Sequence, residues 1–152
     1  MSAQTNVPPV LRSVTVAVPI ERAFDVFTRR IGDWWPLGTH GCFGEESAGV
    51  AFDGERLVER SRSGDQAVWA EVLVWEPPNR IAFTWHPGYA EHDPDTEIEV
   101  RFRARGGTTL VELEHTGWER LGERAEEVRS GYPAGWEYVL GRFEQVLRPG
   151  RH

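Results

Sequence analysis

The stretch "TEIEVRFRARGGTTLVELEH", from Thr96 to His115, carries the most regular pattern in this chain. Two glycines divide it into halves, and charged residues fill every second position of the first half. The positions between them hold the apolar residues Ile98, Val100 and Phe102, and after the glycines Val111 and Leu113 continue the apolar face. Alternation of this kind predicts an antiparallel hairpin with one wet face and one covered face, turning at the Gly-Gly pair.

The same period of two extends toward the N-terminus from this hairpin, back to about Ser47. "GVAFDGERLVERS" contains an Asp53-Gly54 turn between two short apolar runs, which is a hairpin signal. "DQAVWAEVLVWE" and "RIAFTWH" predict two further strands, joined by the turn sequence Pro-Pro-Asn. "VLRSVTVAV" predicts a first strand near the N-terminus.

Two segments have the spacing of amphipathic helices. "PIERAFDVFTRRI" follows the first strand, and a short helical or irregular turn with Trp34 and Trp35 comes after it. The second, "GWEYVLGRFEQVLRPG", puts on one face Trp136, Leu140, Phe143 and Leu147. We expect one domain over residues 1–152, with an ordered core from about 10 to 147.

This order of elements predicts an α+β fold. A curved antiparallel sheet of about seven strands wraps around a long C-terminal helix, and two short helices follow the first strand. One helix cannot close the core of such a sheet alone, so the short helices must plug one end. A cavity between the long helix and the sheet is therefore expected.

Four local features occur in order along the chain: "VAVPIERAFDVFT", "DWWP", "EVLVWEPPNRIAFTW" and "GWEYVLGRFEQVL". In this order and spacing the sequence resembles the START-like (SRPBCC) superfamily. Within it, the chain is similar to the activators of the heat-shock-protein-90 ATPase, in their short, bacterial single-domain form. The resemblance covers roughly residues 10–147 and implies the helix-grip fold. Its superfamily includes lipid carriers, hormone receptors, polyketide cyclases and aromatases, so fold alone does not define the activity.

Composition argues against several classes of protein. The net charge of −7, with no concentrated basic stretch, argues against nucleic acid as a partner. No apolar run approaches the roughly 20 residues that a membrane-spanning helix needs, and no secretory signal pattern is present. The single cysteine fits a reducing compartment, so we expect a cytoplasmic protein.

The segment "RRIGDWWPLGTHGC" gathers residues that binding and metal sites use. His40 and Cys42 have neither the Cys-x2-Cys nor the His-x3-His spacing of structural zinc, so no metal and no cofactor are predicted. Of Trp34 and Trp35, we expect one to pack inward and the other to line or close the entrance of the cavity. The alternative, in which both are ordinary core residues, stays open.

Other candidates follow from alternation along the strands. Phe83 and Trp85 share one face of their strand and are expected to point inward. His115 continues the alternation of Leu113, so it is predicted on the covered face, where it needs a hydrogen-bond partner. A ligand, a neighbouring side chain or water could each supply that partner.

Glu71 lies in "AVWAEVLVW", which is apolar on both faces. Alternation therefore does not tell whether Trp69, Glu71 and Trp75 point in or out. Pointing inward, Glu71 would be a buried acid and a candidate acid/base or ligand anchor. Pointing outward, it would be a solvated charge, with the tryptophans exposed or in a homodimer interface.

Three functional hypotheses follow. The first is a non-enzymatic protein that binds a small, largely apolar or aromatic molecule between the sheet and the C-terminal helix. The second, from the resemblance, is a stress-response module with a chaperone as its partner. The third is a cyclase or aromatase with His115 or Glu71 as acid/base, which requires both groups in one cavity. The residues predicted to contact a ligand are Trp34, Trp35, His40, Glu71, Phe83, Trp85, His115 and Trp136.

Overall fold

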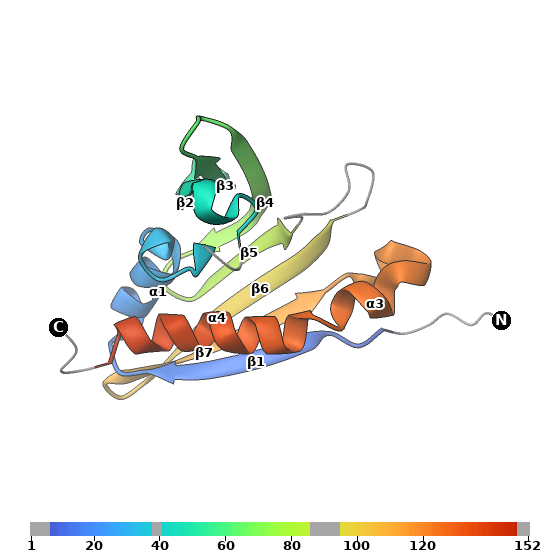
Figure 1. The fold of residues 1–152 in the computed structure, drawn as a ribbon. Helices are drawn as coiled ribbons and strands as arrows, with labels where there is room; N and C mark the ends of the chain where they lie inside the picture. The colour runs from blue at the N-terminus through green and yellow to red at the C-terminus, as the bar shows by residue number, and fades with distance from the viewer. Residues whose placement is uncertain (1–6, 38–40, 86–94, 149–152) are drawn as a thin grey trace.

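A curved, seven-stranded antiparallel sheet forms the framework of the molecule (Figure 1). The computed structural model describes residues 7–37, 41–85 and 95–148. Its elements, in chain order, are β1 (Val10–Val16), α1 (Ile20–Thr28), η1 (Ile31–Asp33), η2 (Gly44–Glu46), β2 (Ser47–Asp53), β3 (Arg56–Ser61), β4 (Gln66–Glu76), β5 (Arg80–Trp85), β6 (Thr96–Arg105), β7 (Thr108–Thr116), η3 (Trp118–Arg124), α3 (Ala125–Arg129) and α4 (Tyr132–Val146).

The strand order in the sheet is β1-β7-β6-β5-β4-β3-β2. β6 and β7 form the hairpin predicted from their alternation, with Val100 opposite Leu113 and Phe102 opposite Val111. In the β2–β3 hairpin Asp53 pairs with Arg56, so the turn lies one residue later than the predicted Asp53-Gly54. The predicted helix-grip arrangement, a curved sheet closed by a long C-terminal helix, is confirmed.

Helix α4 covers the inner face of the sheet and packs against β1, while α1 lies across one end and contacts β6 and β7 (Figure 1). The buried side chains of α4 lie on one stripe of the helix and are Trp136, Val139, Leu140 and Phe143. The two helices are in contact through aromatic rings in the core, since the ring centroids of Phe27 in α1 and Phe143 in α4 lie 5.2 Å apart. Burying these rings against the sheet is the main stabilising term for this layer.

Two register shifts change the face that β4 presents to the core. Leu57 pairs with Ala70 but Val58 pairs with Val68, so Trp69 is an extra residue in β4. A second shift lies between Val72 and Val74. Each extra residue of a β-bulge resets the two-residue period of its strand. Trp69 and Ala70 are therefore both buried although they are consecutive.

Helix α1 ends at Thr28, three residues before the end of the predicted helical segment at Ile31. Ile31 instead begins the 3₁₀ helix η1, which packs against β2. The backbone at Gly32 approaches β2 so closely that a Cβ atom there would lie 2.8 Å from the carbonyl oxygen of Val50. The contact is between two backbones, so neither side can move away at little cost.

Gly32→Ala is expected to lower the free energy of unfolding by about 1–3 kcal/mol, because the new methyl group meets the Val50 carbonyl. Gly141→Ala is the matched control, since a Cβ at Gly141 in α4 meets nothing within 4 Å. It is expected to raise stability by up to about 1 kcal/mol, because alanine favours the helix. Urea unfolding of both variants measures the difference. Equal effects of the two substitutions would contradict the close approach of η1 to β2.

Candidate ligand-binding site

Four tryptophans meet between the sheet and α4, and we call them the tryptophan cluster: Trp35, Trp69, Trp85 and Trp136. They come from the segment after η1, from β4, from β5 and from α4. The ring centroids of the contacting pairs lie 5.1 to 5.9 Å apart. These are tilted and edge-to-face contacts, the arrangements that aromatic quadrupoles favour.

The adjacent tryptophans Trp34 and Trp35 have different surroundings. Trp34 is 1% exposed, donates its indole N–H to the carbonyl of Val26 at 2.9 Å, and packs on Phe27 and Phe143. Trp35 is 7% exposed and is the member of the pair that joins the tryptophan cluster. Both rings are buried and their centroids lie 5.8 Å apart, so the two residues share one core, and Trp35 links Trp34 to the cluster.

Phe83 and Trp85 point into the core, as the alternation of β5 predicts. Phe83 lies between Phe52 of β2 and Trp85, with centroid distances of 6.2 and 6.0 Å. The Trp85 indole N–H donates to the hydroxyl of Tyr132 at the start of α4, at 3.2 Å. The rings of β2, β5 and α4 thus form one continuous aromatic layer.

His115 is fully buried on the inner face, opposite Ile98, and both of its ring nitrogens are hydrogen-bonded. The indole N–H of Trp136 donates to its Nδ1 at 3.0 Å, and its Nε2 lies 2.7 Å from the hydroxyl of Thr96. An indole can only donate, so Nδ1 is the acceptor and the proton of the neutral ring resides on Nε2. The partners of His115 are therefore neighbouring side chains, one of the predicted alternatives.

Burial lowers the pKa of His115 from 6.5 to about 3. The ring of Trp118 lies against the imidazole, with centroids 4.1 Å apart, and adds to its apolar surroundings. A neutral imidazole with both nitrogens engaged is a packing and positioning group at neutral pH, not a proton shuttle.

The side chain of Glu71 is exposed, so of the two orientations that the sequence left open it has the outward one. It pairs with Arg56 across β3 and β4, outside the layer that holds His115. The acid/base pair of the third hypothesis requires His115 and Glu71 in one cavity, and the structure separates them.

Glu59 is a buried carboxylate that the sequence reasoning missed. It is fully buried and accepts hydrogen bonds from the backbone N–H groups of Cys42 at 2.6 Å and Phe43 at 3.3 Å, and from the indole of Trp69 at 3.1 Å. A Cβ at Gly41 would lie 2.7 Å from its Oε2. In the observed register Glu59 pairs with the buried Val50, a pairing that the predicted Asp53-Gly54 turn does not give.

The remaining residues of the segment around Cys42 have simpler roles. His40 lies outside the described residues, and the thiol of Cys42 is exposed. Within residues 7–37, 41–85 and 95–148, no group of three or more His, Cys, Asp or Glu side chains is placed to hold a metal ion. No helix in the described parts of the chain is long and apolar enough to cross a membrane.

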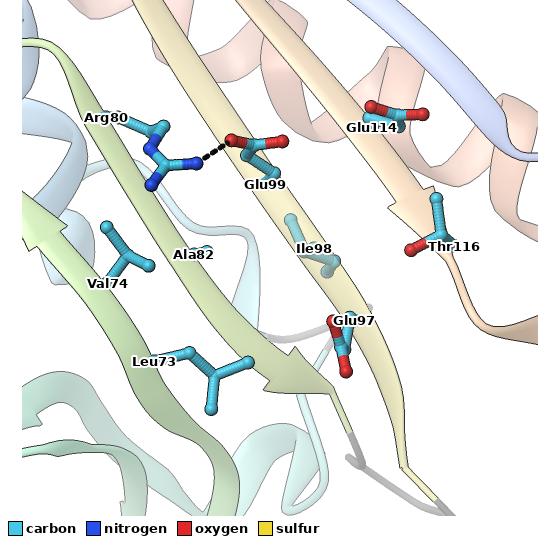
Figure 2. Close-up of a pocket in the computed structure, with 9 residues that line it drawn as sticks. All are labelled: Leu73, Val74, Arg80, Ala82, Glu97, Ile98, Glu99, Glu114 and Thr116. Atoms are coloured by element: carbon cyan, nitrogen blue, oxygen red, sulfur yellow. Dashed lines mark hydrogen bonds and ion pairs between the residues drawn. The ribbon is translucent and has the colours of Figure 1, made fainter.

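A depression of about 260 Å³ lies on the outer face of the sheet, over β4 to β7. Figure 2 shows the residues that line it. Its carboxylates are already paired. Glu99 binds Arg80 at 2.6 Å and Arg101 at 2.8 Å, and Arg101 also binds Glu114 at 3.1 Å. We interpret this depression as a solvated ion-pair network on the wet face, not as a ligand site.

Residues 17–148 match the family described as activator of Hsp90 ATPase homolog 1-like protein. The chain belongs to this family. The family resemblance and the fold predicted from the sequence are thereby confirmed together. A comparison with curated protein sequences gave no match.

The chain is also similar to several solved structures. It is 38% identical to the anthrahydroquino-γ-pyrone synthase Txn09, over 92% of this chain and 97% of that one, with a TM-score of 0.63. It is 28% identical to the self-sacrificing resistance protein CalC from Micromonospora echinospora, over 92% and 94% of the chains, with a TM-score of 0.70. A protein from Mesorhizobium loti, 16% identical over 95% and 99% of the chains with a TM-score of 0.64, shares the fold.

Acid is expected to weaken the fold through His115. Its pKa is about 3 in the fold and 6.5 ordinarily, so the unfolded chain binds more protons between these pH values. Stability therefore falls as the pH falls through this window, by up to about 1.4 kcal/mol per pH unit from this group. In His115→Asn this contribution is absent, so the stability gap between wild type and variant narrows on acidification. Urea unfolding at a series of pH values tests this, and parallel stability curves would contradict it.

Glu59→Ala is expected to lower the free energy of unfolding by about 2–5 kcal/mol, because three N–H donors lose their acceptor. Trp69 also loses the bond that orients its ring. Glu71→Ala is the matched control on the neighbouring strand, where the exposed carboxylate contributes little. Thermal unfolding followed by tryptophan fluorescence compares the two. Similar losses for Glu59→Ala and Glu71→Ala would show that the buried carboxylate has no anchoring role.

Proposed function

We propose that this protein binds a small, flat, largely apolar molecule between the sheet and α4, against the tryptophan cluster. The observation that carries the proposal is the meeting of four indole rings from four separate segments of the chain at one place. Indoles in tilted and edge-to-face contact present large apolar faces, which favour a planar aromatic ligand over a flexible chain.

Hydrogen bonds hold three of the four rings of the cluster in fixed orientations, which supports their role as a binding surface. The indole N–H groups of Trp69, Trp85 and Trp136 are taken up by Glu59, Tyr132 and His115. These bonds fix each ring about its own axis, so the three indoles form a preorganised wall. Preorganisation lowers the entropy that binding must overcome.

Trp35 is the ring that we expect to make room for the ligand. It is the most exposed member of the cluster at 7%, and it lies between η1 and the next element, outside any regular helix or strand. Its indole packs on Trp69, Trp85 and Trp136, the faces that a planar ligand would use. A ligand that takes its place would stack on the same three rings.

The relatives support the same ligand class. The name of the relative at 38% identity, an anthrahydroquino-γ-pyrone synthase, describes an enzyme that forms a fused aromatic compound. We therefore favour a polycyclic aromatic ligand. A non-enzymatic binding protein remains the leading hypothesis for this chain.

A cyclase is the second candidate, and the identity of 38% to Txn09 is the observation that favours it. Neither His115, neutral and doubly bonded, nor the exposed Glu71 is placed as an acid/base for it. A reaction here would depend on the shape that the rings impose on the substrate. Mass spectrometry of a linear aromatic polyketide incubated with the protein distinguishes the two, because a binding protein returns it unchanged.

A chaperone partner and a stress-response role stay predictions from the family. They require binding to the Hsp90-type chaperone and a change in its ATPase turnover. No change at high micromolar concentration would remove them.

Trp35→Ala is expected to bind 1-naphthol, a two-ring aromatic close to an indole in size, at least about ten-fold more tightly than wild type. The wild-type protein must first turn Trp35 away, and only the fraction of molecules in that state binds. The same change is expected to lower the free energy of unfolding by about 3–5 kcal/mol. Trp35→Leu, which keeps part of the packing, is expected to be intermediate in both respects. Isothermal titration calorimetry measures the affinities.

Trp34→Leu is the matched control, because Trp34 packs on Phe27 and Phe143 and touches the cluster through Trp35 itself, not through the three rings that would form the wall. It is expected to lose stability with no gain in affinity. If neither Trp35 variant binds 1-naphthol better than the Trp34 variant does, the cluster is ordinary core and the proposal is wrong.

A further inference from the structure

A notch at the free edge of β4 lies outside the tryptophan cluster. β3 begins at Arg56, opposite Glu71, whereas β4 continues to Glu76 (Figure 1). Beyond Glu71, β4 therefore runs past the end of the β2–β3 hairpin. The step holds a depression of about 360 Å³, lined by Gly54, Glu55, Val72, Leu73 and Trp75. This volume is within the range of about 300–1,000 Å³ that is usual for small-molecule sites.

Trp75 lines this notch, and two phenylalanines on its core side hold its ring in place. Its ring lies 5.5 Å from Phe24 and 5.7 Å from Phe52, both in edge-to-face contact. It is nevertheless 38% exposed, whereas the other six tryptophans of the chain are buried. The supporting rings prevent Trp75 from collapsing inward, so part of its apolar surface stays open to solvent.

The indole N–H of Trp75 also differs from those of the buried tryptophans. Five of them donate to protein acceptors: Trp34, Trp69, Trp85, Trp118 and Trp136. For Trp75, no acceptor is found among the residues that the structure describes. Its donor is therefore left for water or a ligand.

The opposite wall is fixed to β4 and carries a charge. The backbone carbonyl of Glu55 accepts a hydrogen bond from the N–H of Val72 at 2.7 Å, which ties the hairpin turn to the bulged part of β4. The carboxylate of Glu55 is exposed and has no ion pair or hydrogen bond within the described ranges. Leu73, 53% exposed, adds an apolar side to the notch.

We propose that this notch is a second binding site, for a flat aromatic molecule that carries a hydrogen-bond acceptor and a hydroxyl group. Its ring system covers Trp75 and Leu73, its acceptor takes the indole N–H, and its hydroxyl donates to Glu55. This inference is independent of the proposed function, because the notch lies at the sheet edge and shares no lining residue with the tryptophan cluster.

The test uses 2,6-dihydroxyanthraquinone, a flat molecule with two carbonyl acceptors and two free hydroxyls, added to ¹⁵N-labelled full-length protein. Each of the seven tryptophans gives one indole N–H signal, and Trp75→Phe identifies the signal of Trp75. We expect a saturable shift of that signal. Trp75→Phe keeps an aromatic ring but removes the donor and part of the ring surface, so the affinity of the notch for the probe is expected to fall about three- to ten-fold.

Leu73→Ala is expected to weaken binding by about two- to five-fold, because it removes an apolar wall. Leu11→Ala is its matched control, as Leu11 is a similarly exposed leucine on β1, and it is expected to leave the affinity unchanged. A Trp75 signal that does not move up to the solubility limit overturns the notch site. So does binding that is equal in wild type, Trp75→Phe and Leu73→Ala.

The two proposals fail separately. Shifts confined to the cluster indoles, together with tighter 1-naphthol binding by Trp35→Ala, leave the proposed function standing and overturn the notch. A Trp75 shift that depends on Leu73, with no gain in the Trp35 variants, supports the notch and removes the cluster as a ligand site.

Discussion

The hydrogen bond from the Trp136 indole to the imidazole of His115 joins α4 to the inner face of the sheet. It requires an unprotonated Nδ1, so the packing around it depends on the imidazole staying neutral. Burial meets this requirement, because it lowers the pKa of His115 to about 3. The other ring nitrogen, Nε2, is hydrogen-bonded to the hydroxyl of Thr96 on β6. The imidazole of His115 on β7 thus connects α4, β7 and β6.

A second buried polar group holds the opposite end of the aromatic layer. Glu59 binds the backbone of Cys42 and Phe43 and the indole of Trp69. A carboxylate taken out of water is stable only when donors replace its hydration, and here three donors do so. Two polar anchors thus orient Trp69 and Trp136 in a layer that is otherwise apolar. The orientation of the rings, more than their number, makes the cluster a candidate wall for a flat ligand.

The two proposed sites differ in how open they are. In the tryptophan cluster the rings fill one another's space, so a ligand must replace a ring, and Trp35 is the one outside regular secondary structure. At the sheet edge Trp75 is partly exposed, because β4 extends beyond the end of its partner strand β3. Affinity at the first site depends on a conformational equilibrium, whereas at the second it depends on surface already exposed.

Some of this could be predicted from the sequence and some could not. His115 was placed correctly on the inner face because β7 keeps its period without a break from Val111. Glu71 could not be placed, because two register shifts in β4 reset the period and turn that carboxylate outward. Glu59 was missed for a different reason: the donors that permit its burial come from Cys42, Phe43 and Trp69, and no local pattern brings them to it.

By itself, the sequence determined the order of elements, the antiparallel sheet and the long amphipathic helix, because these depend on local periodicity. The tertiary structure decided which tryptophans meet, which carboxylate is buried and which indole stays half open. Those outcomes depend on bulges, on strand lengths relative to their partners and on hydrogen bonds between distant residues. Such contacts join positions far apart in the chain, and no local pattern encodes them.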